Sequence, residues 1–82
     1  MMKIVVDSNI LISALIKDSI TREIIVNSRL RFYYPKMSFH ELIKHKDIVM
    51  KKSGMDNEEY NVLLNHLLNY IKLIPQFFEY LR

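Results

Sequence analysis

Two acidic residues stand where a carboxylate can do chemistry. Asp7 directly follows the β-branched segment of residues 3–6 and precedes Ser8 and Asn9, and Glu41 lies near the start of a predicted helix. Carboxylate oxygens are the ligands that hard cations such as Mg²⁺ prefer, and one or two of them can hold such an ion together with substrate phosphates. The chain contains no cysteine, so carboxylates and histidines are the only side chains available for a metal site.

Both acids also have structural interpretations. Asp7 can cap the following helix by accepting backbone N–H bonds. Ser38 and Glu41 have the spacing of a capping box, which explains Glu41 without any ligand. Helical spacing nevertheless places Glu41, His45 and Lys52 on a stripe outside the apolar arc, so Glu41 is predicted to be free to face a cleft. The residues of that apolar arc are Phe39, Leu42, Ile43, Val49 and Met50.

The histidines and basic residues do not define a separate site. His45 lies one helical turn after Glu41, a spacing that favours an i, i+4 side-chain pair over shared metal coordination. His40 and His66 are predicted on exposed polar faces, and no third histidine is placed to complete a zinc site. Six cations that could contact phosphates are more typical of a solvated surface: Arg29, Arg31, Lys44, Lys46, Lys51 and Lys52.

Length and composition limit the class of protein. With 82 residues, half of them apolar, the chain is expected to form one domain over residues 1–82 with one small core. The formal charge of +3 favours a polyanionic partner without identifying one. The apolar run at the N-terminus is too short for a signal peptide or a membrane span, so a cytoplasmic protein is expected.

The elements that must position the acids alternate between strand and helix. This alternation predicts an α/β domain with a parallel sheet and right-handed crossovers. Ligands of such sheets gather at the carboxyl ends of the strands, which is where Asp7 falls. The predicted strands are residues 3–6, 30–34 and 72–74, and the predicted helices are residues 10–16, 22–28, 38–52, 56–71 and 76–82.

Three short segments occur in a recognisable order: Asp7-Ser8-Asn9 after a valine-rich strand, Tyr34-Pro35 at a strand end, and Phe39-His40-Glu41-Leu42 on a helix. Together they resemble the PIN domain family of metal-dependent nucleases, whose most familiar members are the VapC-type toxins. The resemblance extends over all 82 residues and includes the third strand. It implies a truncated PIN-like fold, in which helices flank a small three-stranded parallel sheet.

The resemblance also implies roles for individual residues. Asp7 resembles the first metal-binding acid of the family, Asn9 the polar residue that supports it, and Glu41 the second acid. Ser8 stands where threonine is commoner. In a complete site the acids would hold Mg²⁺ or Mn²⁺, and the metal would activate a water that attacks an RNA phosphodiester. The implied activity is that of an endoribonuclease.

One departure from the family affects this expectation. The family places its remaining acids after the helix that begins near residue 76, whereas this sequence stops at Arg82, so it resembles only the amino-terminal part of the domain. Weak or absent activity is therefore expected from the 82 residues alone. Five other acids match no position of the family pattern: Asp47, Asp56, Glu58, Glu59 and Glu79.

Two alternative functions stay open from the sequence. The chain could be a non-catalytic PIN-like module that binds RNA or a protein such as an antitoxin, or a structural dimerisation unit. In the PIN fold the first strand is central, and the later strands that would flank it on one side lie beyond Arg82. Residues 3–6 are therefore expected to form an exposed edge strand, which a second copy would cover in a homodimer.

Overall fold

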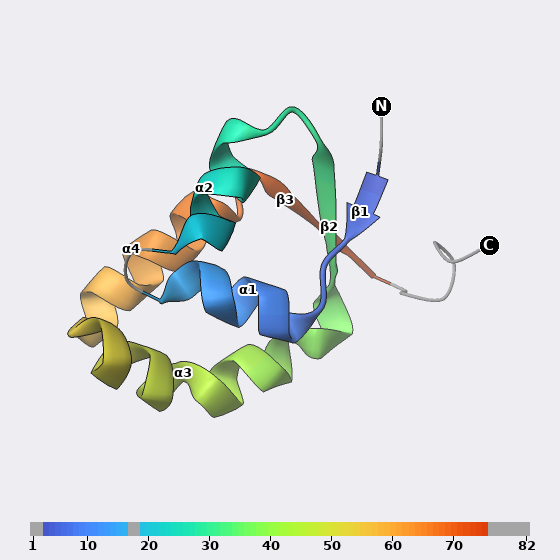
Figure 1. Ribbon diagram of the computed structural model, residues 1–82. Coiled ribbons are helices and arrows are strands. Elements are labelled where there is room, and N and C mark those ends of the chain that lie inside the picture. Colours follow the sequence, from blue (N-terminus) through green and yellow to red (C-terminus); the bar gives the residue numbers. More distant parts are fainter. Residues whose placement is uncertain (1–2, 17–18, 76–82) are drawn as a thin grey trace.

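The fold is a small parallel sheet with helices on one side of it (Figure 1). The structure is a computed structural model that describes residues 3–16 and 19–75. In these residues the chain alternates between strands and helices, which confirms the predicted α/β class. The elements are β1 (Lys3–Val5), α1 (Ser8–Leu15), α2 (Ile20–Asn27), β2 (Arg31–Pro35), the 3-10 helix η1 (Lys36–Ser38), α3 (Phe39–Ser53), α4 (Asn57–Leu67) and β3 (Ile71–Ile74).

The three strands run parallel in the order β1-β2-β3, so β2 is central among the described residues. In the register, Ile4 pairs with Phe32 and Phe32 with Ile71. Pairing continues one residue beyond β1, because the Val6 N–H donates to the Tyr33 carbonyl at 2.8 Å. The carboxyl ends of β1 and β2 therefore meet at one edge of the sheet, as predicted for the site.

Local signals set the ends of the long helices. Gly54 ends α3 in the left-handed conformation with φ 64°, which glycine adopts without a Cβ clash, and its N–H bonds the Met50 carbonyl. Asp56 and Glu59 form a complete capping box at the start of α4. Helix α4 ends at Leu67 rather than at the predicted residue 71, because a turn over residues 68–70 precedes β3. The helix predicted at residues 76–82 lies outside the described residues.

The core fills the space between the sheet and the helices. One prediction about α3 was wrong: Ile43 is 72 % exposed, whereas Leu42 and Val49 are buried as expected. The buried arc of α3 is therefore narrower than the sequence pattern indicates. Lys46 lies on the same side of the helix and holds its Nζ 5.2 Å from the centroid of the Tyr60 ring. The buried apolar residues are Val6, Leu11, Ala14, Leu15, Ile25, Phe32, Tyr34, Leu42, Val49, Tyr60, Leu67, Ile71 and Ile74.

None of the helices described in residues 3–16 and 19–75 is long and apolar enough to cross a membrane.

Candidate functional site

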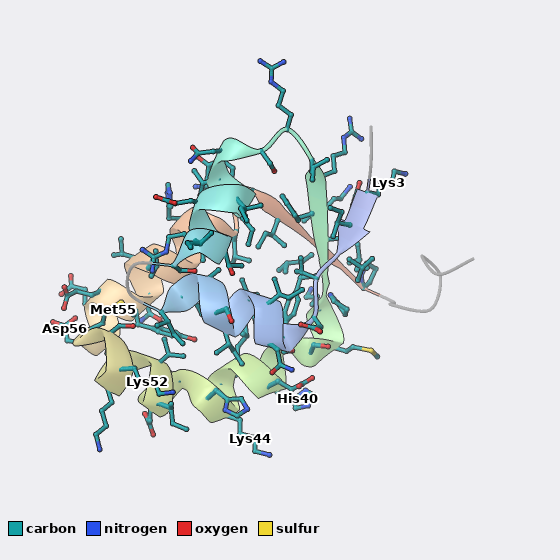
Figure 2. All side chains as sticks on the ribbon, in the orientation of Figure 1. Lys3, His40, Lys44, Lys52, Met55 and Asp56 are labelled. Carbon is teal, nitrogen blue, oxygen red and sulfur yellow. The ribbon has the colours of Figure 1, made fainter. Side chains whose placement is uncertain are left out.

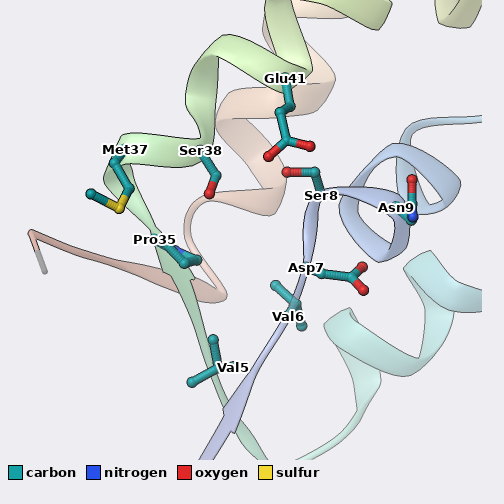
Figure 3. Close-up of a pocket in the computed structure, with 9 residues that line it drawn as sticks. All are labelled: Val5, Val6, Asp7, Ser8, Asn9, Pro35, Met37, Ser38 and Glu41. Atoms are coloured by element: carbon teal, nitrogen blue, oxygen red, sulfur yellow. The ribbon is translucent and has the colours of Figure 1, made fainter. Parts of the chain in front are cut away.

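A pocket of about 420 Å³ lies at the carboxyl ends of β1 and β2. Three chain segments form it: the end of β1 with the start of α1, the turn after β2, and the first turn of α3 (Figure 3). The structure brings all four residues predicted for the site into the lining of this one pocket. The lining residues are Val5, Val6, Asp7, Ser8, Asn9, Pro35, Met37, Ser38 and Glu41.

Asp7 caps α1. Its backbone is extended, and its Oδ1 accepts a 2.9 Å hydrogen bond from the Ile10 N–H. The structural interpretation of this residue is therefore confirmed. Capping uses only one carboxylate oxygen and leaves the side chain exposed in the pocket lining, so it is compatible with a second role in binding a cation.

Glu41 has a different environment from the one that the capping box implied. Ser38 occupies the N-cap position of α3. Its backbone is not extended, with ψ of 1°, and its side chain makes no capping hydrogen bond. The prediction of a Ser38–Glu41 capping box was therefore wrong, because η1 leads directly into α3 and leaves no extended residue between them. Figure 3 shows the exposed Glu41 carboxylate directed from α3 toward Ser8, whereas the Asp7 carboxylate is turned toward the start of α1.

Ser8 belongs to a buried chain of hydrogen bonds that joins the two acid-bearing segments. Its Oγ lies 2.7 Å from the hydroxyl of Tyr34, and that hydroxyl donates to the Ser38 carbonyl at 2.9 Å. A phenol has a single proton, so the Ser8 hydroxyl must donate to Tyr34 and not the reverse. Ser8 therefore offers the pocket only acceptor lone pairs.

The sequence did not single out Tyr34 beyond its place at a strand end. It is fully buried, and the edge of its ring packs against Phe39 at 5.8 Å between centroids. Burial raises the pKa of the Tyr34 hydroxyl, the hydrogen bond from Ser8 lowers it, and the charges of Glu41 and Asp7 raise it further. The charges of both acids therefore act in the same direction on this hydroxyl.

The remaining polar residues contribute less. Asn9 is exposed in the pocket lining, and no hydrogen bond joins it to Asp7 in the part of the chain that the structure describes. Figure 2 labels His40, Lys44 and Lys52 on α3, and all three are exposed. That placement fits the solvated surface expected for them.

The described residues contain few clusters of side chains that can bind a metal. Within residues 3–16 and 19–75, no group of three or more histidine or acidic side chains is placed to hold one ion. Among the acids without a family position, Asp56 and Glu59 are occupied by the capping box of α4, and Glu79 lies outside the described residues. Asp7 and Glu41 are therefore the acids that the described structure offers to a cation in this pocket.

Comparison with known proteins gives one match. A family model described as PIN domain matches residues 5–80. Neither the search of curated proteins nor the search of solved structures gives a match.

Proposed function

The chain belongs to the PIN domain family, and from this premise we propose that it binds Mg²⁺ or Mn²⁺ through Asp7 and Glu41 and acts weakly on RNA, as an endoribonuclease of the VapC type. The family implies a nuclease-related function, and PIN domains generally use divalent metals. The observation that carries the proposal is that two exposed acidic residues, from separate elements, line one pocket at the carboxyl ends of parallel strands.

The residues present fit a hard, water-rich cation. Mg²⁺ retains several waters and needs only one or two protein carboxylates when substrate phosphates complete its shell. A bound ion would supply Lewis-acid chemistry to a phosphodiester and an activated water. The capping bond from Ile10 fixes the orientation of Asp7. Glu41 projects from the first turn of α3, and its carboxylate has no hydrogen bond or ion pair to a described residue.

Titration with Mn²⁺ tests the metal part of the proposal. We expect paramagnetic broadening of amide NMR signals to centre on Asp7 and Glu41 at millimolar or lower Mn²⁺. Asp47→Asn removes an exposed acid further along α3 and serves as the matched control, with broadening unchanged. Broadening that spares both Asp7 and Glu41 would overturn the assignment of the site.

Cleavage of a single-stranded RNA with added Mn²⁺ tests the activity. Asp7→Asn is the informative variant, because asparagine caps a helix about as well as aspartate and preserves the start of α1. Turnover that is present in the wild type and lost in Asp7→Asn supports the proposal. Turnover that is unaffected by Asp7→Asn would assign the activity elsewhere.

A non-catalytic RNA-binding module is the second candidate. It is favoured by the absence, in the described residues, of any third acid or histidine beside Asp7 and Glu41. A two-carboxylate site is a weaker support for chemistry than a larger acid set. RNA binding detected by fluorescence anisotropy without any Mn²⁺-dependent cleavage would select this candidate. The same non-catalytic module could instead bind an antitoxin-like partner protein.

We also propose self-association through the edge of the sheet. Among the described residues β1 is an edge strand, and Lys3 is its single charged residue. Successive N–H groups of a strand point in opposite directions, so the Val5 N–H points away from β2 when the Val6 N–H bonds Tyr33. We expect a dimer by analytical ultracentrifugation at micromolar concentration, with a slowly exchanging Val5 amide. A monomer, or a dimer with a rapidly exchanging Val5 amide, would contradict pairing through β1.

A further inference from the structure

We propose that Tyr34 is a positioning residue that sets the spacing of the Asp7 and Glu41 carboxylates for a divalent cation. This inference rests on the proposed function, because it concerns the same site. It adds a residue that contacts no metal itself and acts through two hydrogen bonds. Tyr34 lies at the carboxyl end of β2, between the two segments that carry the acids.

The first link runs to Asp7. The Tyr34 hydroxyl accepts from Ser8, which follows Asp7 in the chain and is the first residue of α1. Ser8 is only 6 % exposed, so losing the hydrogen bond to Tyr34 would leave its hydroxyl largely buried without this partner. The bond therefore fixes the start of α1 against the central strand, one residue away from the carboxylate.

The second link runs to Glu41. The same hydroxyl donates to the carbonyl of Ser38, which lies at the N-cap position of α3 and three residues before Glu41. The Ser38 side chain makes no capping bond, so the start of α3 lacks the local anchor that Asp7 gives to α1. The edge contact between Tyr34 and Phe39 holds the first residue of the same helix.

One buried hydroxyl thus connects two segments that are far apart in sequence. Tyr34 and Ser8 are 26 positions apart, and the Tyr34 hydroxyl bonds both the Ser8 hydroxyl of α1 and the Ser38 carbonyl before α3. Groups that orient metal-binding side chains typically change metal affinity by about 10- to 100-fold when they are removed. A comparable effect is expected here.

The test compares Mn²⁺ affinity across a set of single-atom changes in the 82-residue chain. Tyr34→Phe keeps the ring and removes only the hydroxyl, and we expect about 10- to 100-fold weaker Mn²⁺ binding. Ser8→Ala should lose affinity in the same range, whereas Ser8→Thr keeps a hydroxyl and should retain it. Tyr33→Phe removes a hydroxyl from the preceding residue of β2, on the opposite face of the sheet, and is the matched control with unchanged affinity.

A double variant separates positioning from general damage. If Tyr34 and Ser8 act through one bond, Tyr34→Phe with Ser8→Ala should bind Mn²⁺ no more weakly than the weaker single variant. Losses that multiply, or losses that merely follow a fall in melting temperature, would show two independent structural defects and overturn the inference. Affinity in Tyr34→Phe equal to that of the wild type would overturn it as well.

Metal-free NMR spectra keep this inference distinct from the proposed function. In Tyr34→Phe we expect amide shift changes in both residues 7–9 and residues 38–41 without any metal present. Changes confined to β2 or to one of the two segments would refute the link, even if the wild type binds Mn²⁺. A wild type that fails to bind Mn²⁺ would refute the proposed function and the metal-positioning role together, while shift changes in both segments would still establish the structural link.

Discussion

The pockets at the two ends of the sheet are lined by residues of opposite charge. At the carboxyl ends of β1 and β2, Asp7 and Glu41 line a pocket of about 420 Å³. At the amino ends of β2 and β3, a pocket of about 480 Å³ is lined by Arg31 and Lys72 and contains no acidic residue in its lining. The two hollows are similar in volume, so charge and not size distinguishes the end that suits a cation.

The direction of the chain explains this difference. After β1 and after β2 the chain turns into a helix, so α1 and α3 begin at the carboxyl end of the sheet. Helix N-termini present unpaired N–H groups and a positive dipole end, which favour carboxylates. The strands β2 and β3 instead follow the ends of α2 and α4, where exposed carbonyls favour cations. Parallel topology thus sorts acidic and basic side chains to opposite ends.

The largest expected effect on Mn²⁺ affinity comes from removing a charge at the carboxyl end of the sheet. Glu41→Gln keeps the length of the side chain and removes its charge, so we expect at least about 100-fold weaker Mn²⁺ binding by calorimetry or NMR. Lys72→Gln is the corresponding change at the other end and should leave the affinity within about twofold, since bulk solvent screens so distant a charge. Equal effects of the two variants would remove the distinction between the two ends.

A smaller effect separates stability from metal binding at Asp7. Asp7→Ala removes the cap of α1 and should lower the free energy of unfolding by about 1 kcal/mol, whereas Asp7→Asn should change it by only a few tenths. Both variants should lose Mn²⁺ binding. Asp56→Ala removes the cap of α4 and should destabilise to a similar extent without affecting the metal, which chemical denaturation measures directly. An Asp7→Asn variant as unstable as Asp7→Ala would show that the charge, and not the cap, supports the fold.

The smallest effect concerns alkaline pH. Burial raises the pKa of Tyr34 and of Tyr60 above the ordinary value of tyrosine, so the neutral phenols are favoured in the fold. Because the unfolded chain then loses its protons first, the stability from these residues is complete below about pH 10 and falls as pH rises through the folded pKa.

Chemical unfolding at about pH 8 and about pH 11 measures this loss. Tyr34→Phe should show a smaller alkaline decrease in unfolding free energy than the wild type, and so should Tyr60→Phe. The exposed Tyr70→Phe supplies the control for the removal of a hydroxyl. A decrease in Tyr34→Phe equal to that in Tyr70→Phe would contradict the assignment to the buried phenol.

Much of the fold follows from short-range patterns in the sequence. The order of the strands and helices was predicted correctly, and α3 ends at Ser53, one residue from the predicted end. Gly54 after α3 and the capping box of Asp56 and Glu59 at the start of α4 are local signals of the same kind. The position of Asp7 at a strand end, with its alternative role as a cap, was visible for the same reason. Each of these features depends on residues within about four positions of one another, where hydrogen bonds and backbone preferences are fixed by local order.

Tertiary structure decided the features that depend on distant residues. The capping box expected at Ser38 is absent, because η1 continues into α3 and the Ser38 backbone is not extended. Ile43 is exposed although its position on the helix suggested burial, because the packing of α3 against the fold sets how wide the buried arc is. Periodicity indicates which face of a helix is apolar but not how much of that face a neighbour covers.

The sequence by itself determined that Asp7 directly follows the first strand and that Glu41 lies near the start of the helix after the second strand, since strand, cap and helix signals are local. Only the tertiary structure decided that Asp7 and Glu41 line the same pocket and that Tyr34 links their segments. A contact across 26 positions depends on strand register and on the alternation of side chains between the two faces of the sheet. Those are set by the packing of the whole sheet against its helices, which no short segment encodes alone.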